Sequence, residues 1–493
     1  MADSPRLEEA NPLLESESDS RSSLEYLQDA SEFDQNGDPE NPLEWPTSYK
    51  WGIVALLSLM GFTATSTCIS ITPITGYIID DLNGSPGSPG SKSASVALVT
   101  IWELGEAVGP FFIAPLSEMF GRYRLYIIMN TMFTMATVFA ALAPSTGLLI
   151  ASRALMGISV ACNVLNPAII GDMFVSEQRG TAITFIMFIP LAGGTIGPVL
   201  SGAILQTFGW RTIIWIGVAM AVICQMLFLA FFKETYKVQI LGRRSARLFQ
   251  ELGACEKDKD PKMDWAGFCC SAMRPFVVLF SSSVLGALLV FGSFNFSYFY
   301  VVTTTLPDIL KDVYGLSPTA TGFAFIANAI GTVISLAISK TLLDKIYVKL
   351  RSLNGGKDLP EYRLPLSIIG GLMLPPAIIL YGWCAEYGLP LFVFLFTVMW
   401  LRTSIMLATS PLTAYVVDAC GVYSASAMAG FISARCLTSA FLPLSTSHLT
   451  GRLGYSGGFS VLGGLSLAFA SIPVLIYRNG EQWRQRSWYT SNA

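Results

Sequence analysis

Twelve long apolar runs constrain this chain more than any other feature of its sequence. A helix needs about 20 mostly apolar residues to cross a bilayer. The chain has 493 residues, of which 52% are hydrophobic and only 13% charged, whereas soluble domains carry about 25% charged residues. This pattern predicts an all-α membrane protein with twelve transmembrane helices, and it disfavours the buried helices of a large soluble enzyme. The runs lie at about 51–75, 95–115, 125–143, 147–170, 182–205, 212–232, 275–302, 319–341, 364–385, 389–411, 425–447 and 457–477.

The distribution of lysine and arginine predicts which loops face the cytosol, because cytosolic loops carry an excess of both. With a cytosolic N-terminus, the predicted outer loops hold only Lys92, Arg211, Lys311 and Arg452. Both termini are therefore predicted to be cytosolic. The expected segments are a disordered acidic tail (1–50), a six-helix bundle (51–232), a charged cytosolic linker (233–274), a second six-helix bundle (275–477) and a cytosolic C-tail (478–493).

Charge and rare residue types exclude several kinds of function. The net charge of −3 gives no reason to expect nucleic acid as a partner. The nine cysteines are scattered, mostly inside apolar runs, so we expect small buried side chains rather than disulfides or a metal site. His448 is the only histidine, and it lies near an outer helix end. We therefore expect no cofactor and no enzymatic centre.

Five short motifs follow one another along the chain. They are "NPLEWPTSYKW" (41–51), "PLSEMFGR" (115–122), "RALMG" (153–157), "GGTIGPVLSG" (193–202) and "YVVDACGVYSASAMAGFISARCL" (415–437). Together they resemble the major facilitator superfamily, specifically its fungal branch of twelve-span drug:proton antiporters. The resemblance implies the major facilitator fold, with two six-helix bundles and a central cavity. Lys233 and Arg402 depart from that branch, where proline and a small or apolar residue are usual.

The turn between spans 2 and 3 carries Glu118, Gly121 and Arg122. Glycine tolerates backbone conformations that a Cβ would oppose, and Glu118 and Arg122 lie four apart, where they can pair. The turn could be a topology anchor, whereas the resemblance implies a latch between conformations. The loop between spans 8 and 9 (338–350) also has an acidic residue followed by a basic one, as the turn between spans 2 and 3 does. This weak similarity suggests that the two halves are repeats.

Span 5 carries Gly193, Gly197, Pro198 and Gly202. Small residues four apart allow close helix packing in lipid, and proline permits a bend. Tight packing alone could explain the glycines. The resemblance implies a bend that limits leakage between the halves, which favours antiport.

Charged residues inside spans usually face a cavity or a partner, because isolated charges are costly in lipid. Glu103 and Glu106 share one helix face of span 2, and helix rise places Arg153 of span 4 at a similar depth. We expect Glu103 or Glu106 to carry the coupled proton with Arg153 as its partner, or else the three to form a static ion pair. Arg402 and Arg435 are the charges expected inside the second bundle, and Arg402 could mark a site for an electron-rich substrate.

These observations favour a proton-driven exporter of small, mostly apolar compounds such as secondary metabolites, toxins or antifungal drugs. The alternatives are a nutrient or polyamine transporter working by uptake or facilitated diffusion, and a non-transporting membrane sensor. We expect a functional monomer in the lipid bilayer, with a small-molecule substrate and protons as its partners. The plasma membrane is the expected location, and an acidic dileucine pattern (9–14) leaves vacuolar or endosomal membranes as the alternative. Asn83 begins a glycosylation sequon in the first outer loop.

Overall fold

The computed structural model describes residues 38–83, 89–251, 279–355, 359–420 and 424–485, and three positions between 273 and 277. Its elements in this part of the chain are all helical. The first half contains η1 (Pro42–Glu44), α2 (Thr47–Ser70), η2 (Thr72–Ile74), α3 (Thr75–Asn83), α4 (Pro89–Phe120), α5 (Arg122–Ala141), α6 (Thr146–Val160), η3 (Ala161–Leu165), α7 (Asn166–Met173), α8 (Ser176–Phe208) and α9 (Trp210–Phe231). The helix α10 (Lys237–Glu251) follows. The second half contains α12 (Ser283–Asp312), α13 (Pro318–Ala324), α14 (Ile326–Leu353), η4 (Pro360–Arg363), α15 (Leu364–Tyr387), α16 (Leu391–Cys420) and α17 (Ser424–Arg484).

The predicted all-α membrane fold with twelve spans is confirmed. Among the described residues, eleven helical stretches are long and apolar enough to cross a membrane. The last of them, Ser426–Arg484, has 59 residues, which is far more than the roughly 20 that one crossing needs. Gly454 inside it has φ 70° and ψ 176° and breaks the helix in two. The α17 stretch therefore supplies spans 11 and 12.

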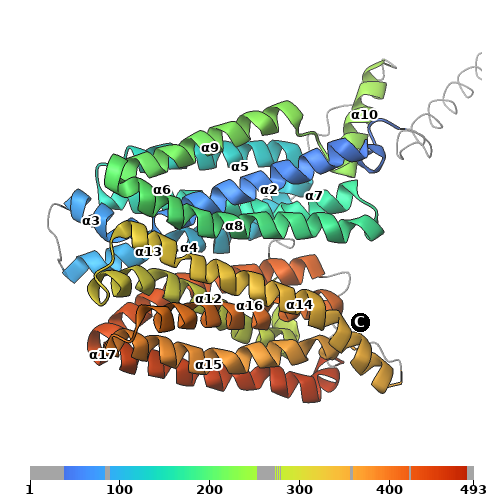
Figure 1. Cartoon of the computed structure of the whole chain (residues 1–493). Coiled ribbons are helices and arrows are strands. Elements are labelled where there is room, and N and C mark those ends of the chain that lie inside the picture. The colour runs from blue at the N-terminus through green and yellow to red at the C-terminus, as the bar shows by residue number, and fades with distance from the viewer. Residues whose placement is uncertain are drawn as a thin grey trace, which may run out of the picture.

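The two halves form two helical bundles that lie side by side (Figure 1). The α10 helix and the C-terminal end of α17 lie at the same end of the molecule, on the right in Figure 1. We call this end the inner face, since the lysine and arginine distribution predicts it to be cytosolic, and the opposite end the outer face. The halves contact each other mainly where α4 meets α17 and where α8 meets α13.

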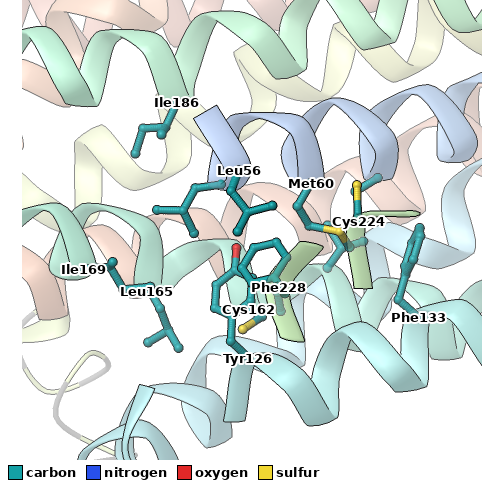
Figure 2. Packing of buried hydrophobic residues seen from close by; sticks show 14 of the residues in the cluster. Leu56, Met60, Tyr126, Phe133, Cys162, Leu165, Ile169, Ile186, Cys224 and Phe228 are labelled. Carbon is teal, nitrogen blue, oxygen red and sulfur yellow. The ribbon is translucent and has the colours of Figure 1, made fainter. Parts of the chain in front are cut away.

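Each half has its own hydrophobic core. In the first half, side chains from α2, α5, α8 and α9 interdigitate with those of the span formed by α6, η3 and α7 (Figure 2). Tyr126 and Phe228 stack there with ring centroids 4.9 Å apart. Cys162 and Cys224 are buried in the same cluster as free thiols. Close packing of this kind makes the interior of the bundle stiff, because densely packed cores have low compressibility.

Helical structure extends further at both ends than expected. Residues 38–50, predicted to belong to the disordered tail, include η1 and the start of α2, and Asp38 pairs with Arg244 of α10 at 2.7 Å. Arg484, predicted to lie in the C-tail, is buried at the end of α17 and pairs with Glu361 at 3.4 Å. Hydropathy could not reveal these contacts, because each depends on a charge supplied by a distant segment.

Span 7 lies further toward the outer face than its apolar run suggested. The run covers about 275–302, whereas α12 extends from Ser283 to Asp312. Ser282 has an extended backbone, with φ −115° and ψ 117°. The helix therefore begins inside the apolar run.

Candidate functional site

Two glutamates of α4 lie in the contact between the halves. Glu103 is only 2% exposed, and its Oε1 accepts a 2.5 Å hydrogen bond from the Tyr300 hydroxyl of α12. Gly105, about 200° further around α4, packs so tightly on α6 that a Cβ there would lie 2.5 Å from the Ala154 carbonyl oxygen. Because the glycine face of α4 packs on its own half, the glutamate face is turned toward the second half.

Glu106 lies on the same face as Glu103, next to the span 11 part of α17. One ligand atom each from Glu103, Glu106 and Cys436 lie within 4.8 Å of one another. Arg435 interacts electrostatically with both carboxylates. The distances alone would suit a metal ion, but the positive charge of Arg435 opposes a bound cation. We call Glu103, Glu106, Tyr300, Arg435 and Cys436 the central cluster.

Arg153 does not form the predicted pair with a glutamate. Its Nε donates to the Leu98 carbonyl at 3.0 Å, and its Nη2 donates to the Cys68 carbonyl at 2.5 Å. The ion pairs among the described residues include none between Arg153 and Glu103 or Glu106. Helix rise predicts a common depth for these residues, but it gives no direction around the helix axis. In the structure the charge of Arg435, from the other half, acts on both glutamates, although the ion pairs among the described residues include none between Arg435 and either of them.

Arg402 and Arg435, the two arginines predicted to lie inside spans of the second half, both stack on aromatic rings of α12. The guanidinium carbon of Arg435 lies 4.0 Å from the Phe296 ring centroid, and that of Arg402 lies 4.1 Å from the Phe299 centroid. Phe299 and Tyr300 form an edge contact with centroids 5.0 Å apart. These contacts hold both cations beside the central cluster, as cation–π attraction would favour.

Several buried polar atoms around the central cluster have no hydrogen-bond partner among the described residues. They include Trp102 Nε1, Glu103 Oε2, Arg402 Nη1 and Arg435 Nε. Buried polar atoms in native proteins are nearly always satisfied, if necessary by water or a ligand. Their concentration here indicates a site that water, protons or a substrate complete.

The turn between α4 and α5 is clamped at the inner face. Gly121 has φ 87°, a conformation that disfavours other residues. Glu234, just after α9, accepts hydrogen bonds from the backbone of Arg122 at 2.9 Å and Tyr123 at 3.2 Å. The Arg122 side chain pairs with Asp172 of α7 at 2.7 Å. This clamp ties spans 3, 4 and 6 together, while the side chain of Glu118 lies outside the described residues.

The second half repeats part of this clamp. Arg363, at the start of span 9, pairs with Asp418 near the end of span 10. Arg122 and Asp172 hold the equivalent places in spans 3 and 4 of the first half. This second ion pair fits the predicted repeat of the two halves. It joins spans 9 and 10, whereas the prediction was based on the acid-then-base stretch between spans 8 and 9.

The span 5 motif contacts both halves. A Cβ at Gly193 would lie 2.6 Å from the Phe62 carbonyl oxygen, and one at Gly197 would lie 2.7 Å from that of Ser66, so both glycines let α8 pack on α2. Gly202, one turn beyond Pro198, instead meets the second half, since its Cβ would lie 2.6 Å from the Pro318 carbonyl oxygen.

Sequence reasoning missed several residues of these sites, namely Asp172, Glu234, Tyr300, Arg363, Asp418 and Cys436. Tyr300 and Cys436 gave no sequence signal, because a tyrosine or cysteine inside an apolar span is ordinary. Asp172 and Glu234 could have been found as acids at the inner ends of spans 4 and 6. Asn83 is exposed at the end of α3, and its amide oxygen accepts a hydrogen bond from Thr146.

Comparison with known proteins agrees with this architecture. The family model for the Major Facilitator Superfamily matches residues 52–443. The MFS transporter cpaT of Aspergillus oryzae is 30% identical over 461 residues, which cover 93% of this chain and 92% of that relative. The efflux pump radE of Floropilus chiversii is also 30% identical, over 92% of this chain and 84% of the relative.

Solved structures support the fold. The xylose transporter XylE from E. coli, in a partially occluded inward open conformation, matches with a TM-score of 0.64 over 88% of this chain and 98% of that one. Its sequence is only 16% identical, so the likeness concerns the fold alone. The family match spans most of this chain, and relatives at 30% identity cover more than nine tenths of it. This protein therefore belongs to the major facilitator superfamily, close to its fungal members, and is a membrane transporter rather than an enzyme.

Proposed function

We propose that the protein exports small, mostly apolar compounds in exchange for protons, by exposing a central site alternately to the two sides of the membrane. The observation that supports this most is the central cluster, in which glutamates of the first half meet a tyrosine and an arginine of the second half. One similar protein is named an efflux pump. The span 5 motif, typical of antiporters in the family that this chain resembles, adds further support.

The glutamates can carry a proton because their surroundings depend on how the halves sit. Burial disfavours an ionised carboxylate and a nearby cation favours it, so a group that alternates between such settings can take up and release a proton. Glu103 and Glu106 belong to the first half, whereas Arg435 belongs to the second. Movement of one half against the other would change the distance between these charges, and proton affinity would follow the conformation.

Partners and location form part of the same proposal. The substrate would be a small molecule, protons would be the coupling ion, and the protein would act as a monomer in the bilayer. We place it in the plasma membrane, with the vacuolar or endosomal membrane as the alternative, and we propose that Asn83 carries a glycan. A fluorescent fusion protein and a glycosidase gel shift would test the last two points.

The test of the function begins with a substrate screen, comparing intracellular accumulation between a deletion strain and an overexpressing strain. The compound found is then loaded into proteoliposomes under an imposed pH gradient. We expect the wild-type protein to move it uphill. We expect Glu103→Gln or Glu106→Gln to lose most of the response to the gradient, because glutamine keeps the shape of the side chain but cannot titrate.

Glu44→Gln serves as the control, because Glu44 is exposed near the start of the chain and away from the central cluster. If both cluster variants kept an undiminished response, the proton-carrier role would be lost and the glutamates would be structural. If the wild-type protein moved the compound only downhill, exchange with protons would be refuted altogether.

A further inference from the structure

Arg402 is a buried cation that has no carboxylate partner in the part of the chain that the structure describes. It lies on α16, is 7% exposed, and its Nε donates to the Thr332 hydroxyl of α14 at 2.9 Å. Its Nη1 has no acceptor, and no ion pair involves Arg402 among the described residues. A buried charge without a partner is costly, and inside a membrane it usually marks a functional site.

The fold holds the guanidinium in place. Gly331 lets α14 and α16 approach so closely that a Cβ there would lie 2.5 Å from the Met399 carbonyl oxygen and 2.9 Å from the Arg402 Cβ. The Arg402 head is fixed further by Thr332 and by the ring of Phe299. Since the side chain is held from three sides, its free N–H groups are oriented before any ligand arrives, which lowers the entropy cost of binding.

A second unpaired donor lies on the same face of α14. Asn328 is 8% exposed, and its Nδ2 has no acceptor among the described residues. Asn328 lies four residues before Thr332, so the two occupy one helix face. The amide of Asn328 and the guanidinium of Arg402 therefore flank the same strip of α14, and both offer hydrogen to an oxygen atom.

The aromatic neighbours lie where the two halves meet. Phe296 and Phe299 belong to the second half, yet both pack against the core of the first half. Both side chains remain partly exposed. A ring in that position can pack flat against a planar ligand, while the arginine stacked on it points a charged donor at the ligand's oxygen.

We propose that Arg402, Asn328 and Phe299 form a binding site for the ionised oxygen of a planar aromatic acid, such as a carboxylate attached to a ring system. This rests on the proposed transport function and narrows its substrate class to organic anions. Arginine suits the role because its planar fork binds carboxylates through two parallel hydrogen bonds. The central cluster keeps its own counter-charge in Arg435, so anion binding at Arg402 leaves both glutamates free to carry protons.

The test uses purified full-length protein in detergent, without any gradient, and two probes of matched shape. The probes are 2-naphthoate, which is anionic, and 2-naphthamide, which is neutral, and calorimetric titration measures their affinities. We expect the wild-type protein to bind 2-naphthoate at least about tenfold more tightly than 2-naphthamide, as charge-assisted hydrogen bonds predict. Arg402→Gln should remove this preference, and Arg402→Lys should keep part of it.

Arg452→Gln is the matched control, since Arg452 is exposed near the outer face, and it should bind both probes as the wild-type protein does. If Arg402→Gln fails to fold, Asn328→Ala provides a second test and should weaken 2-naphthoate binding several-fold. Equal wild-type affinity for the two probes, no 2-naphthoate binding, or a preference that survives in the variants would each overturn the proposal. Loss of uphill transport in Glu103→Gln with unchanged 2-naphthoate affinity would separate proton coupling from this site.

Discussion

Arg153 and Arg435 are both buried inside spans, but their guanidinium groups contact different things. Arg153 donates to main-chain carbonyls of α4 and α2 and so braces three helices of the first half. Arg435 interacts with the two glutamates and stacks on Phe296. We therefore expect Arg153 to contribute to the stability of the fold. We expect Arg435, which faces titratable groups of the other half, to contribute to the coupling of transport to protons.

Conservative substitutions should separate the two roles. Arg153→Lys cannot reach both carbonyls with one nitrogen, so we expect a loss of about 1.5–3 kcal/mol in the free energy of unfolding, the usual worth of a hydrogen bond to a charged group. Thermal unfolding in detergent should show a lower Tm, with the pH-gradient response per folded molecule retained. Arg435→Lys should instead keep the wild-type Tm and lose the pH-gradient response per folded molecule. An Arg153→Lys protein with a normal Tm and no gradient response would restore Arg153 as the coupling partner.

At the scale of helices, two matching turns, one of α8 and one of α13, join the halves near the outer face. We call this contact the outer crossing. The α8 helix contributes Pro198 and Gly202, and α13 contributes Pro318 and Gly322, with the same spacing in each. A Cβ on either glycine would lie 2.6 Å from the carbonyl oxygen of the opposite proline. The Thr319 hydroxyl also donates to the Gly202 carbonyl at 2.9 Å. The crossing therefore closes only because neither glycine carries a side chain.

Gly202→Ala should hold the outer ends of the halves apart. Real Cβ atoms do not approach a carbonyl oxygen at 2.6 Å, so α8 and α13 must separate by several tenths of an ångström. We expect a lower rate of uphill transport. We also expect faster labelling, from outside, of a cysteine placed at Tyr77 of α3, whose ring lies against Lys311 of α12 in the second half. Gly464→Ala is the control, because a Cβ there meets nothing within 4 Å. Normal transport by Gly202→Ala would show that the crossing tolerates separation.

At the scale of the whole molecule, the contacts suit two bodies that rock against each other. Each half is braced internally at the inner face, by Arg122 and Asp172 in the first and by Arg363 and Asp418 in the second. The halves meet at the outer crossing and at the central cluster. If the halves stay in contact at the outer end and each half is braced internally, they can separate at the inner face without either half deforming. Such a movement would open the central site to the inner side.

The orientation of the molecule can be tested with two single cysteines in a chain whose nine native cysteines are replaced by serine. Val238 of α10 is 62% exposed at the inner face, and Leu453, just before the break in α17, is 53% exposed at the outer face. A membrane-impermeant maleimide should label Leu453→Cys in intact cells and Val238→Cys only after permeabilisation. Labelling of Val238→Cys in intact cells would reverse the predicted topology.

The sequence by itself determined the number of spans, because the length and hydropathy of a run are local properties that the bilayer imposes on each helix separately. It also placed Glu103, Glu106 and the glycines of span 5 at positions that proved to lie between helices. Even where one long helical stretch covers two spans, as in α17, the apolar runs separated spans 11 and 12 correctly.

Only the tertiary structure decided which charges meet. Glu103 and Tyr300 are 197 residues apart, and nothing local to either span indicates the other. The direction of a side chain around its helix axis depends on how that helix packs, and packing is set by segments distant in the chain. For that reason depth alone paired the glutamates with Arg153, whereas in the folded molecule the charge of Arg435 acts on them. Among the described residues, Arg402 forms no ion pair.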